Sequence, residues 1–313
     1  MLILTIKKLK WSTVLSEYLK MKTPLKFGLV IAILSIVATV GYGADSRPLM
    51  EFKENGLINW TTGVVEAKGL GAPEAYTYYG KARADRQNTL SEAVAKARHN
   101  LLEILVSLRI DSESRVINVV EVFPSVMTQL RSMAHRAPEI ETLRKYLYDG
   151  TVEVWSRMKL TGGFSQLILP PEIRHIEPIK QLLPPESSSK SKSHQRSEQI
   201  HTGLVVDARG LPATPVLSPR ILDEKLNEVF GPAYASREYA VQRGVVRYAT
   251  DIWKAKFNLR VSDNPLIVKA LKTTGPGRCD FIISNASADK LRSHFEHLQF
   301  LKECRVIIVL DPL

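Results

Sequence analysis

Cysteine is scarce in this sequence, where only Cys279 and Cys304 occur among 313 residues. No cysteine lies near the amino terminus, so attachment of a lipid through a cysteine behind a leader is excluded. The chain also lacks the Gly-x-Ser-x-Gly elbow of many hydrolases, the His-Glu-x-x-His pair of zinc proteases and a complete phosphate-binding glycine loop. These absences argue against the common hydrolases and nucleotide-binding enzymes.

Acidic residues are a minority, because 32 Asp and Glu stand against 43 Lys and Arg, for a net charge of +11. Residues 1–43 contribute six lysines and one glutamate, so the rest of the chain carries about +6, spread along its length. A mild and dispersed positive charge does not require nucleic acid, and no nucleic-acid partner is predicted.

The one long uncharged run predicts export. Met21 to Lys26 is short and basic, Phe27 to Val40 is a 14-residue run without charge, and Gly41 and Gly43 supply small residues ahead of Ala44. This layout is typical of a secretory signal peptide, so residues 1–43 are predicted to be removed between Gly43 and Ala44. The mature protein is then expected in the periplasm or cell envelope.

Two alternatives remain for the leader. Residues 25–42 offer 18 residues, close to the roughly 20 that cross a bilayer core, and a retained leader is an inner-membrane anchor. In that case the leader is the only expected contact with the membrane. Residues 1–20 fit poorly in front of a signal peptide, and a second start at Met21 gives a conventional leader, which suggests a misassigned start.

A segment rich in serine, lysine and proline divides the mature chain. Residues 184–199 contain no apolar side chain apart from their prolines, so they cannot bury enough surface to offset the entropy of ordering. They are predicted to form a linker between a first domain at 45–183 and a second at 200–313.

The first domain is predicted to be a long helix on a small sheet. The helix is expected over 81–108, where Leu90, Leu101 and Leu105 belong to a stripe that steps by three and four residues. A loop is expected at Gly69-Leu-Gly71-Ala-Pro73. The other expected elements are strands at 57–67, 115–123 and 151–160 and short helices at 127–134 and 139–148.

The second domain is predicted to be a mixed sheet that ends in a β-α-β unit. Strands are expected at 203–207, 216–222, 280–284 and 305–310, with a helix at 288–300 after an N-cap at Asn285. The last two strands are expected to run parallel. The fold class is therefore α+β, with two small domains.

Two cysteines and two histidines gather near the carboxyl terminus. Cys279 and Cys304 flank the expected helix that carries His294 and His297. This set is compatible with zinc, with a Cys279–Cys304 disulfide in an oxidising compartment, or with two buried free thiols. Because no Cys-x-x-Cys fork is present, no metal or cofactor is predicted.

Two further groups of residues are candidates for function. Tyr76, Tyr78 and Tyr79 cluster before the long helix and offer a possible aromatic surface for a partner. Asp207, Asp280 and Asp311 lie at or next to the ends of expected strands and are the carboxylates that an enzyme would use.

Residues 63–112 resemble a known family. The similarity rests on Gly63, Gly69-x-Gly71-Ala, Lys81-Ala-Arg-Ala84, the stretch from Ala93 to Glu103, and Leu108-Arg-Ile-Asp-Ser112, and it extends more weakly through 151–160. These residues resemble the LPP-twenty family of small bacterial surface lipoproteins, and the N-terminal module of the flagellar assembly protein T is similar. The resemblance implies an α+β fold, an envelope location and a non-catalytic role. The lipidated cysteine of that family is missing here.

Together these features predict an exported envelope protein that is not an enzyme. It is expected to act as an interaction or assembly module, for example in a cell-surface or motility apparatus, with an envelope protein of unknown identity as its partner. The alternative is a periplasmic enzyme that uses carboxylates of the second domain.

Overall fold

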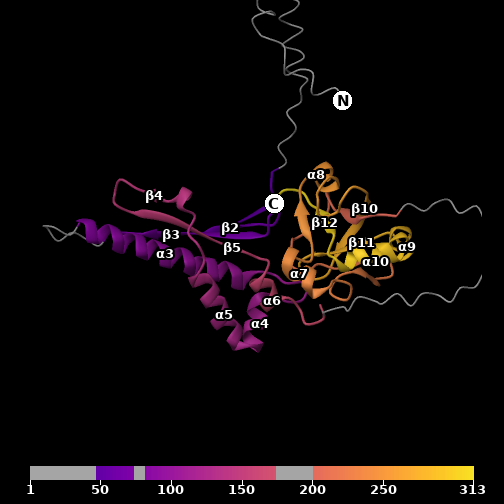
Figure 1. Cartoon of the computed structure of the whole chain (residues 1–313), viewed down its shortest axis with the longest axis horizontal. Coiled ribbons are helices and arrows are strands. Elements are labelled where there is room, and N and C mark those ends of the chain that lie inside the picture. Colours follow the sequence, from indigo (N-terminus) through magenta and orange to yellow (C-terminus); the bar gives the residue numbers. More distant parts are fainter. Residues whose placement is uncertain (1–46, 74–81, 174–199) are drawn as a thin grey trace, which may run out of the picture. The chain divides into compact units, whose positions relative to one another are not determined.

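A computed structural model describes residues 47–73, 82–173 and 200–313, and residues 47–313 form one compact unit (Figure 1). The Gly43–Ala44 cleavage point, the linker at 184–199 and the tyrosines at 76, 78 and 79 lie outside the described residues, so these three predictions stay untested. Within the described ranges, no helix has both the length and the apolar character to cross a membrane.

The first sheet is antiparallel throughout, with strand order β1-β2-β3-β5-β4. Its strands are β1 Met50–Lys53, β2 Gly56–Asn59, β3 Val64–Gly71, β4 Lys145–Tyr146 and β5 Val152–Lys159. The long helix α3, Ala82–Ser107, lies across β3 and β5 (Figure 1). The prediction of a long helix packed on a small sheet is therefore confirmed.

Glycines let α3 approach the sheet closely. Gly69 and Gly71 lie inside β3, so the loop expected at 69–73 is wrong for these positions. A Cβ atom at Gly69 would lie 2.1 Å from the carbonyl oxygen of Ala93 and 2.2 Å from the nitrogen of Ala97. A Cβ atom at Gly71 would lie 2.0 Å from the carbonyl oxygen of Thr89. The helix backbone occupies the space of the missing side chains, a use of glycine in strands that marks close backbone approach.

Two strand predictions in the first half need correction. The run 57–67 is a hairpin of β2 and β3, which turns near Gly63 with φ at +68°. The run 115–123 is the helix α4, Val116–Val122. The side chain of Asn118 accepts a hydrogen bond from the backbone nitrogen of Arg115 at 2.8 Å and caps this helix. Val116 is buried and Val119 and Val120 pack partly against the core, so packing overrides the β propensity of these valines.

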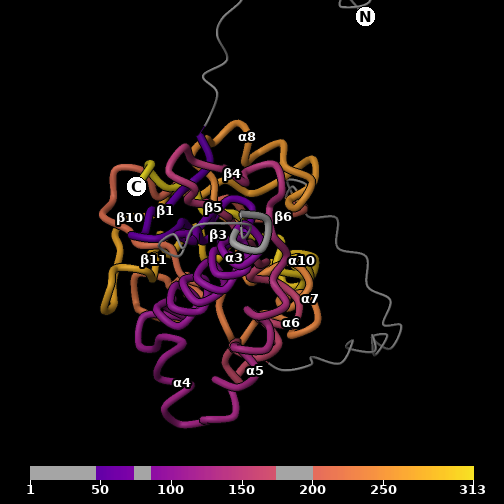
Figure 2. Tube along the Cα trace, turned by 90° about the vertical axis from the view of Figure 1, so that its left-hand side faces the viewer, coloured from indigo at the N-terminus to yellow at the C-terminus, as the bar shows by residue number. Residues whose placement is uncertain are grey.

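The remaining elements of the first half follow α4. They are α5 Pro124–His135, the 3₁₀ turn η2 Glu141–Leu143 and α6 Gly163–Ile168. Helix α5 confirms the helix expected at 127–134, whereas the helix expected at 139–148 is replaced by η2 and the edge strand β4. Figure 2 shows α4 and α5 side by side, as their contacts also require.

The second sheet is mixed, with strand order β8-β7-β11-β10-β6-β12-β9. Its strands are β6 Gly203–Asp207, β7 Ile221–Leu222, β8 Glu228–Phe230, β9 Arg247–Ala249, β10 Pro265–Thr274, β11 Asp280–Ile283 and β12 Val306–Val309. Its helices are α7 Arg237–Arg243, α8 Ile252–Lys256, α9 Asn285–Arg292 and α10 Phe295–Lys302. The mixed sheet confirms the predicted fold class.

The ending of the second sheet differs from the predicted β-α-β unit. Strands β11 and β12 are separated by β10 and β6, and they run in opposite directions because β10 is antiparallel to β11 but parallel to β6. The expected single helix is two helices, α9 and α10. Ser284, not Asn285, is the N-cap, since its side chain accepts from the nitrogen of Ser287. These pairings depend on β10, which the sequence pattern did not predict.

The two sheets share one hydrophobic core. The rings of Trp60 and Tyr248 meet edge to face, with centroids 5.8 Å apart and an interplanar angle of 77°. The backbone nitrogen of Ser218 donates to the carbonyl oxygen of Ile110 at 2.7 Å. These contacts join residues from both sides of the segment 174–199 into the compact unit.

Candidate functional site

An open groove of about 990 Å³ lies between the α4–α5 corner, the segment after α6 and the residues around β8. Its walls are largely apolar and include Val119, Phe123, Val126, Leu167 and Ile173. Phe123 is 59% exposed, an unusual state for a large aromatic side chain at the corner of two packed helices. The groove therefore presents apolar surface without a covering element in the described residues.

The basic side chains of the groove are already engaged in structural bonds. Arg237 donates to the carbonyl oxygens of Gln166 at 2.8 Å and Pro170 at 3.2 Å, which fixes the segment after α6. Arg220 donates to the hydroxyl of Ser112 at 2.7 Å and so links the two sheets. These hydrogen bonds hold the walls of the groove in place.

The carboxylates of the groove give it a negative rim. Asp111, Glu113, Glu172 and Glu228 line it, and burial raises the pKa of Glu228. The lining described here contains no histidine, cysteine, lysine or tyrosine. Ser112 and Ser114 are the hydroxyl side chains of this lining, and the hydroxyl of Ser112 accepts a hydrogen bond from Arg220.

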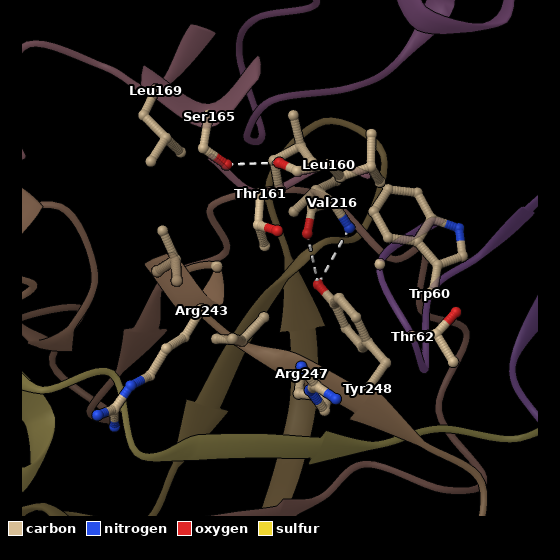
Figure 3. A pocket seen from close by; sticks show the side chains of 15 residues that line it. Trp60, Thr62, Leu160, Thr161, Ser165, Leu169, Val216, Arg243, Arg247 and Tyr248 are labelled. Carbon is tan, nitrogen blue, oxygen red and sulfur yellow. Dashed lines mark hydrogen bonds between the residues drawn. The ribbon is translucent and has the colours of Figure 1, made fainter. Parts of the chain in front are cut away.

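A smaller cavity of about 40 Å³ lies between the sheets (Figure 3). The hydroxyl of Tyr248 donates to the carbonyl oxygen of Val216 at 2.9 Å and accepts from its nitrogen at 3.0 Å. Burial raises the pKa of this tyrosine, and the side chain of Arg243 points away from it (Figure 3). The cavity has room for only a few water molecules. Tyr248 serves the packing of the two sheets.

Of the three carboxylates singled out in the sequence, Asp207 and Asp311 lie near Arg209 at the ends of the neighbouring parallel strands β6 and β12, whereas Asp280 pairs with a different arginine. Asp280 is fully buried and binds the guanidinium of Arg220 at 2.8 and 3.1 Å. Asp207 pairs with Arg209 at 2.8 Å, and this hydrogen bond lowers the pKa of Asp207. Asp311 accepts from a backbone nitrogen in the loop after β6 at 2.6 Å. Each of the three carboxylates accepts a hydrogen bond from an arginine side chain or a backbone nitrogen.

Cys279 and Cys304 are free thiols, and both are buried, so the disulfide alternative is not realised. Cys279 precedes β11 and Cys304 precedes β12, and these strands run in opposite directions with two strands between them. The topology therefore places the thiols at opposite ends of the strands. Burial raises the pKa of Cys279 to about 11 and that of Cys304 to about 12, which makes both poor nucleophiles.

The histidines near the cysteines also have structural partners. His297 is buried, and its Nε2 accepts from the backbone nitrogen of His201 at 3.1 Å while its Nδ1 donates to the carbonyl oxygen of Lys290 at 2.7 Å. Both ring nitrogens are thereby occupied. Among the residues that the structure describes, no group of three or more histidine, cysteine or acidic side chains is placed to hold a metal.

One surface was missed in the sequence. Trp253 and Phe257 are exposed on and after α8, with their rings stacked at 6.4 Å and 11°. Lys256 places its Nζ 5.6 Å and 5.5 Å from the two ring centroids, and Leu259 follows. We call Trp253, Lys256, Phe257 and Leu259 the aromatic patch. Trp253 and Phe257 are four residues apart, a spacing that places two side chains on the same face of a helix. Helix α8 has only five residues, however, too few to show a helical period in the sequence.

Comparison with protein families matches residues 203–312 to the second domain of Treponema pallidum Tp0624. The matched range holds the seven-stranded sheet and its four helices. The groove wall contributed by residues 110–173 lies outside it. No curated protein matches the chain.

Proposed function

We propose that this chain is an exported, non-catalytic interaction module of the bacterial envelope, which binds a segment of an envelope protein in the groove beside α4 and α5. The observation that carries the proposal is an open apolar groove whose arginines already bind the protein's own backbone and side chains. Export rests on the leader sequence at 21–44.

The chemistry of the groove suggests the kind of segment it takes. Phe123 is the one aromatic side chain of its lining that could act as a central anchor, since aromatic residues in partly enclosed apolar sites carry much of the energy of an interface. The acidic rim favours lysine or arginine on the partner, which would steer association and fix its register. We therefore propose a partner segment with apolar anchors and basic flanks.

A photo-crosslinking amino acid at position 123, in intact cells that make the full chain, tests this proposal. We expect a discrete crosslinked envelope protein, and Phe123→Ala should weaken its co-purification by about fivefold or more, the loss typical of a hot-spot aromatic. The matched control is position 52, where Phe52 is exposed on β1 away from the groove. Equal crosslinking at both positions, or unchanged capture by Phe123→Ala, would contradict the proposal.

The absence of catalysis is tested separately. Asp207→Asn and Asp311→Asn remove the two carboxylates at the ends of the neighbouring parallel strands β6 and β12. If the chain acts by docking, both variants keep cellular function provided that they fold. A folded variant that has lost function, beside a normal Phe123→Ala, would favour the enzyme.

A further inference from the structure

We propose that the aromatic patch lies against the surface of an anionic phospholipid membrane, the one through which this chain is exported. The inference rests on the export proposed above. The patch lies on and just after α8, and none of its residues lines the groove, so the inference does not depend on the protein partner of that groove.

The patch lies on the outer side of α8, whose inner side packs against the second sheet. Ala255 is buried, and Ile252 packs against the small apolar cluster that contains Val205 and Ile307. The helix starts at Asp251, whose side chain accepts from the nitrogen of Lys254 at 2.9 Å. Because the inner side of α8 supplies its contacts with the core, the aromatic side chains on its outer side do not belong to the core.

The apolar side chains of the patch are highly exposed. Trp253 is 65% exposed, Phe257 is 69% exposed and Leu259 is 98% exposed. Stacked rings with a lysine beside them combine an apolar surface with a cation, the composition found where proteins meet the headgroup region of a bilayer. Lysine near such a surface is attracted by anionic lipids.

The charges around the patch are of both signs. Lys254 and Lys256 lie on α8. Asp251 caps the helix and, with Asp207 and Asp311, lies near Arg209. Lys256, which lies beside the two rings, is the cation that an anionic surface would meet.

The start of the described chain lies beside the helix that carries the patch. The hydroxyl of Thr250 donates to the carbonyl oxygen of Arg47, and Thr250 lies two residues before α8. Six residues, 41–46, separate the apolar run that ends at Val40 from Arg47, and a chain of this length reaches at most about 25 Å. While that run is in a bilayer during export, or afterwards if it is retained, the tether holds this end of the protein close to the lipid surface.

The experiment measures lipid contact at Trp253 directly. The full chain is reconstituted into phosphatidylglycerol–phosphatidylethanolamine vesicles in which part of the lipid carries bromine, a quencher of tryptophan fluorescence. Trp253→Phe keeps the patch apolar and isolates the signal of Trp253 by difference from the other tryptophans. We expect Trp253 to be quenched and its emission to shift to shorter wavelength, and Lys256→Glu with Leu259→Asp should abolish most of that quenching.

A tryptophan in the groove is the matched control. Phe123→Trp in the Trp253→Phe background places an exposed indole on the first half, which we expect to remain unquenched. Vesicles of phosphatidylcholine with the same bromine content should quench Trp253 less, because they lack the anionic charge.

Three outcomes would overturn the proposal. They are an unquenched Trp253 in anionic vesicles, equal quenching of the indole introduced by Phe123→Trp, and unchanged quenching in a folded protein that carries Lys256→Glu with Leu259→Asp. Crosslinking of position 253 to a protein without any quenching would instead assign the patch to a protein partner.

Discussion

The two sheets of this protein differ in how their strands pair and in what packs against them. In the first sheet each strand pair is antiparallel, and the covering helix α3 comes so close to β3 that only glycine fits at positions 69 and 71. In the second sheet parallel and antiparallel pairs mix, and buried charges such as the Arg220–Asp280 pair hold the connections between strands. A close glycine contact also occurs in the second half, where a Cβ atom at Gly203 would lie 2.7 Å from the Cα atom of Val261.

This difference predicts which substitutions destabilise each half. A close helix–strand contact has no room for an added atom, because backbone atoms cannot move aside as a flexible side chain does. A buried ion pair has the opposite weakness, since removing one partner leaves a buried charge uncompensated. The following predictions add an atom to the first half, remove a charge from the second, and then tune a charge at the groove.

The largest effect is expected for Gly69→Val. Its Cβ atom would overlap the backbone of α3 at Ala93 and Ala97, so the helix must move away from β3. We expect a loss of at least about 3 kcal/mol in the free energy of unfolding, measured by urea denaturation. The control is Gly210→Ala, where φ is +80° but the space is open, and about 1 kcal/mol of backbone strain is expected. Similar losses in both variants would show that α3 does not press on Gly69.

The next effect is expected for Asp280→Asn. The buried carboxylate accepts two hydrogen bonds from the Arg220 guanidinium and one from its backbone nitrogen, and the neutral amide leaves that cation unbalanced. A loss of about 3 kcal/mol is expected in the same assay. Asp207→Asn breaks a more exposed pair with Arg209 and should cost less than about 1 kcal/mol. If Asp280→Asn and Asp207→Asn reduce the free energy of unfolding equally, burial of Asp280 does not determine how much its ion pair contributes to stability.

The smallest effect is expected for Glu228→Gln, and it is stabilising. Burial raises the pKa of Glu228, so the folded state disfavours its charged form, and the charge reduces stability as the pH rises through the folded pKa. At pH 8 the amide should gain less than about 1 kcal/mol, and below the ordinary carboxyl pKa of roughly 4.3 the gain should vanish. Thermal unfolding at pH 8 and pH 3.5 checks this, with the exposed Glu54→Gln as control. A loss of stability at pH 8 would mean that attraction to Arg220 outweighs burial.

Local patterns predicted the elements whose burial follows a simple period. The stripe through Leu101 and Leu105 gave α3 nearly to its ends, and the alternating run at 151–160 gave β5. The valine-rich run at 115–123 failed because valine suits a strand in isolation, whereas here a side-chain cap and one buried face select a helix. The groove had no sequence signal at all, because its walls come from segments far apart in the chain.

The sequence by itself determined the α+β class, the long helix and several of the buried strands, because hydrophobic period and residue type act locally. Only the tertiary structure decided the order of the second sheet, the separation of Cys279 from Cys304 and the use of Gly69 as a contact with α3. Each of these depends on which distant segments pair, and pairing is fixed by packing over the whole core, where one residue's neighbours are set by the placement of all the others.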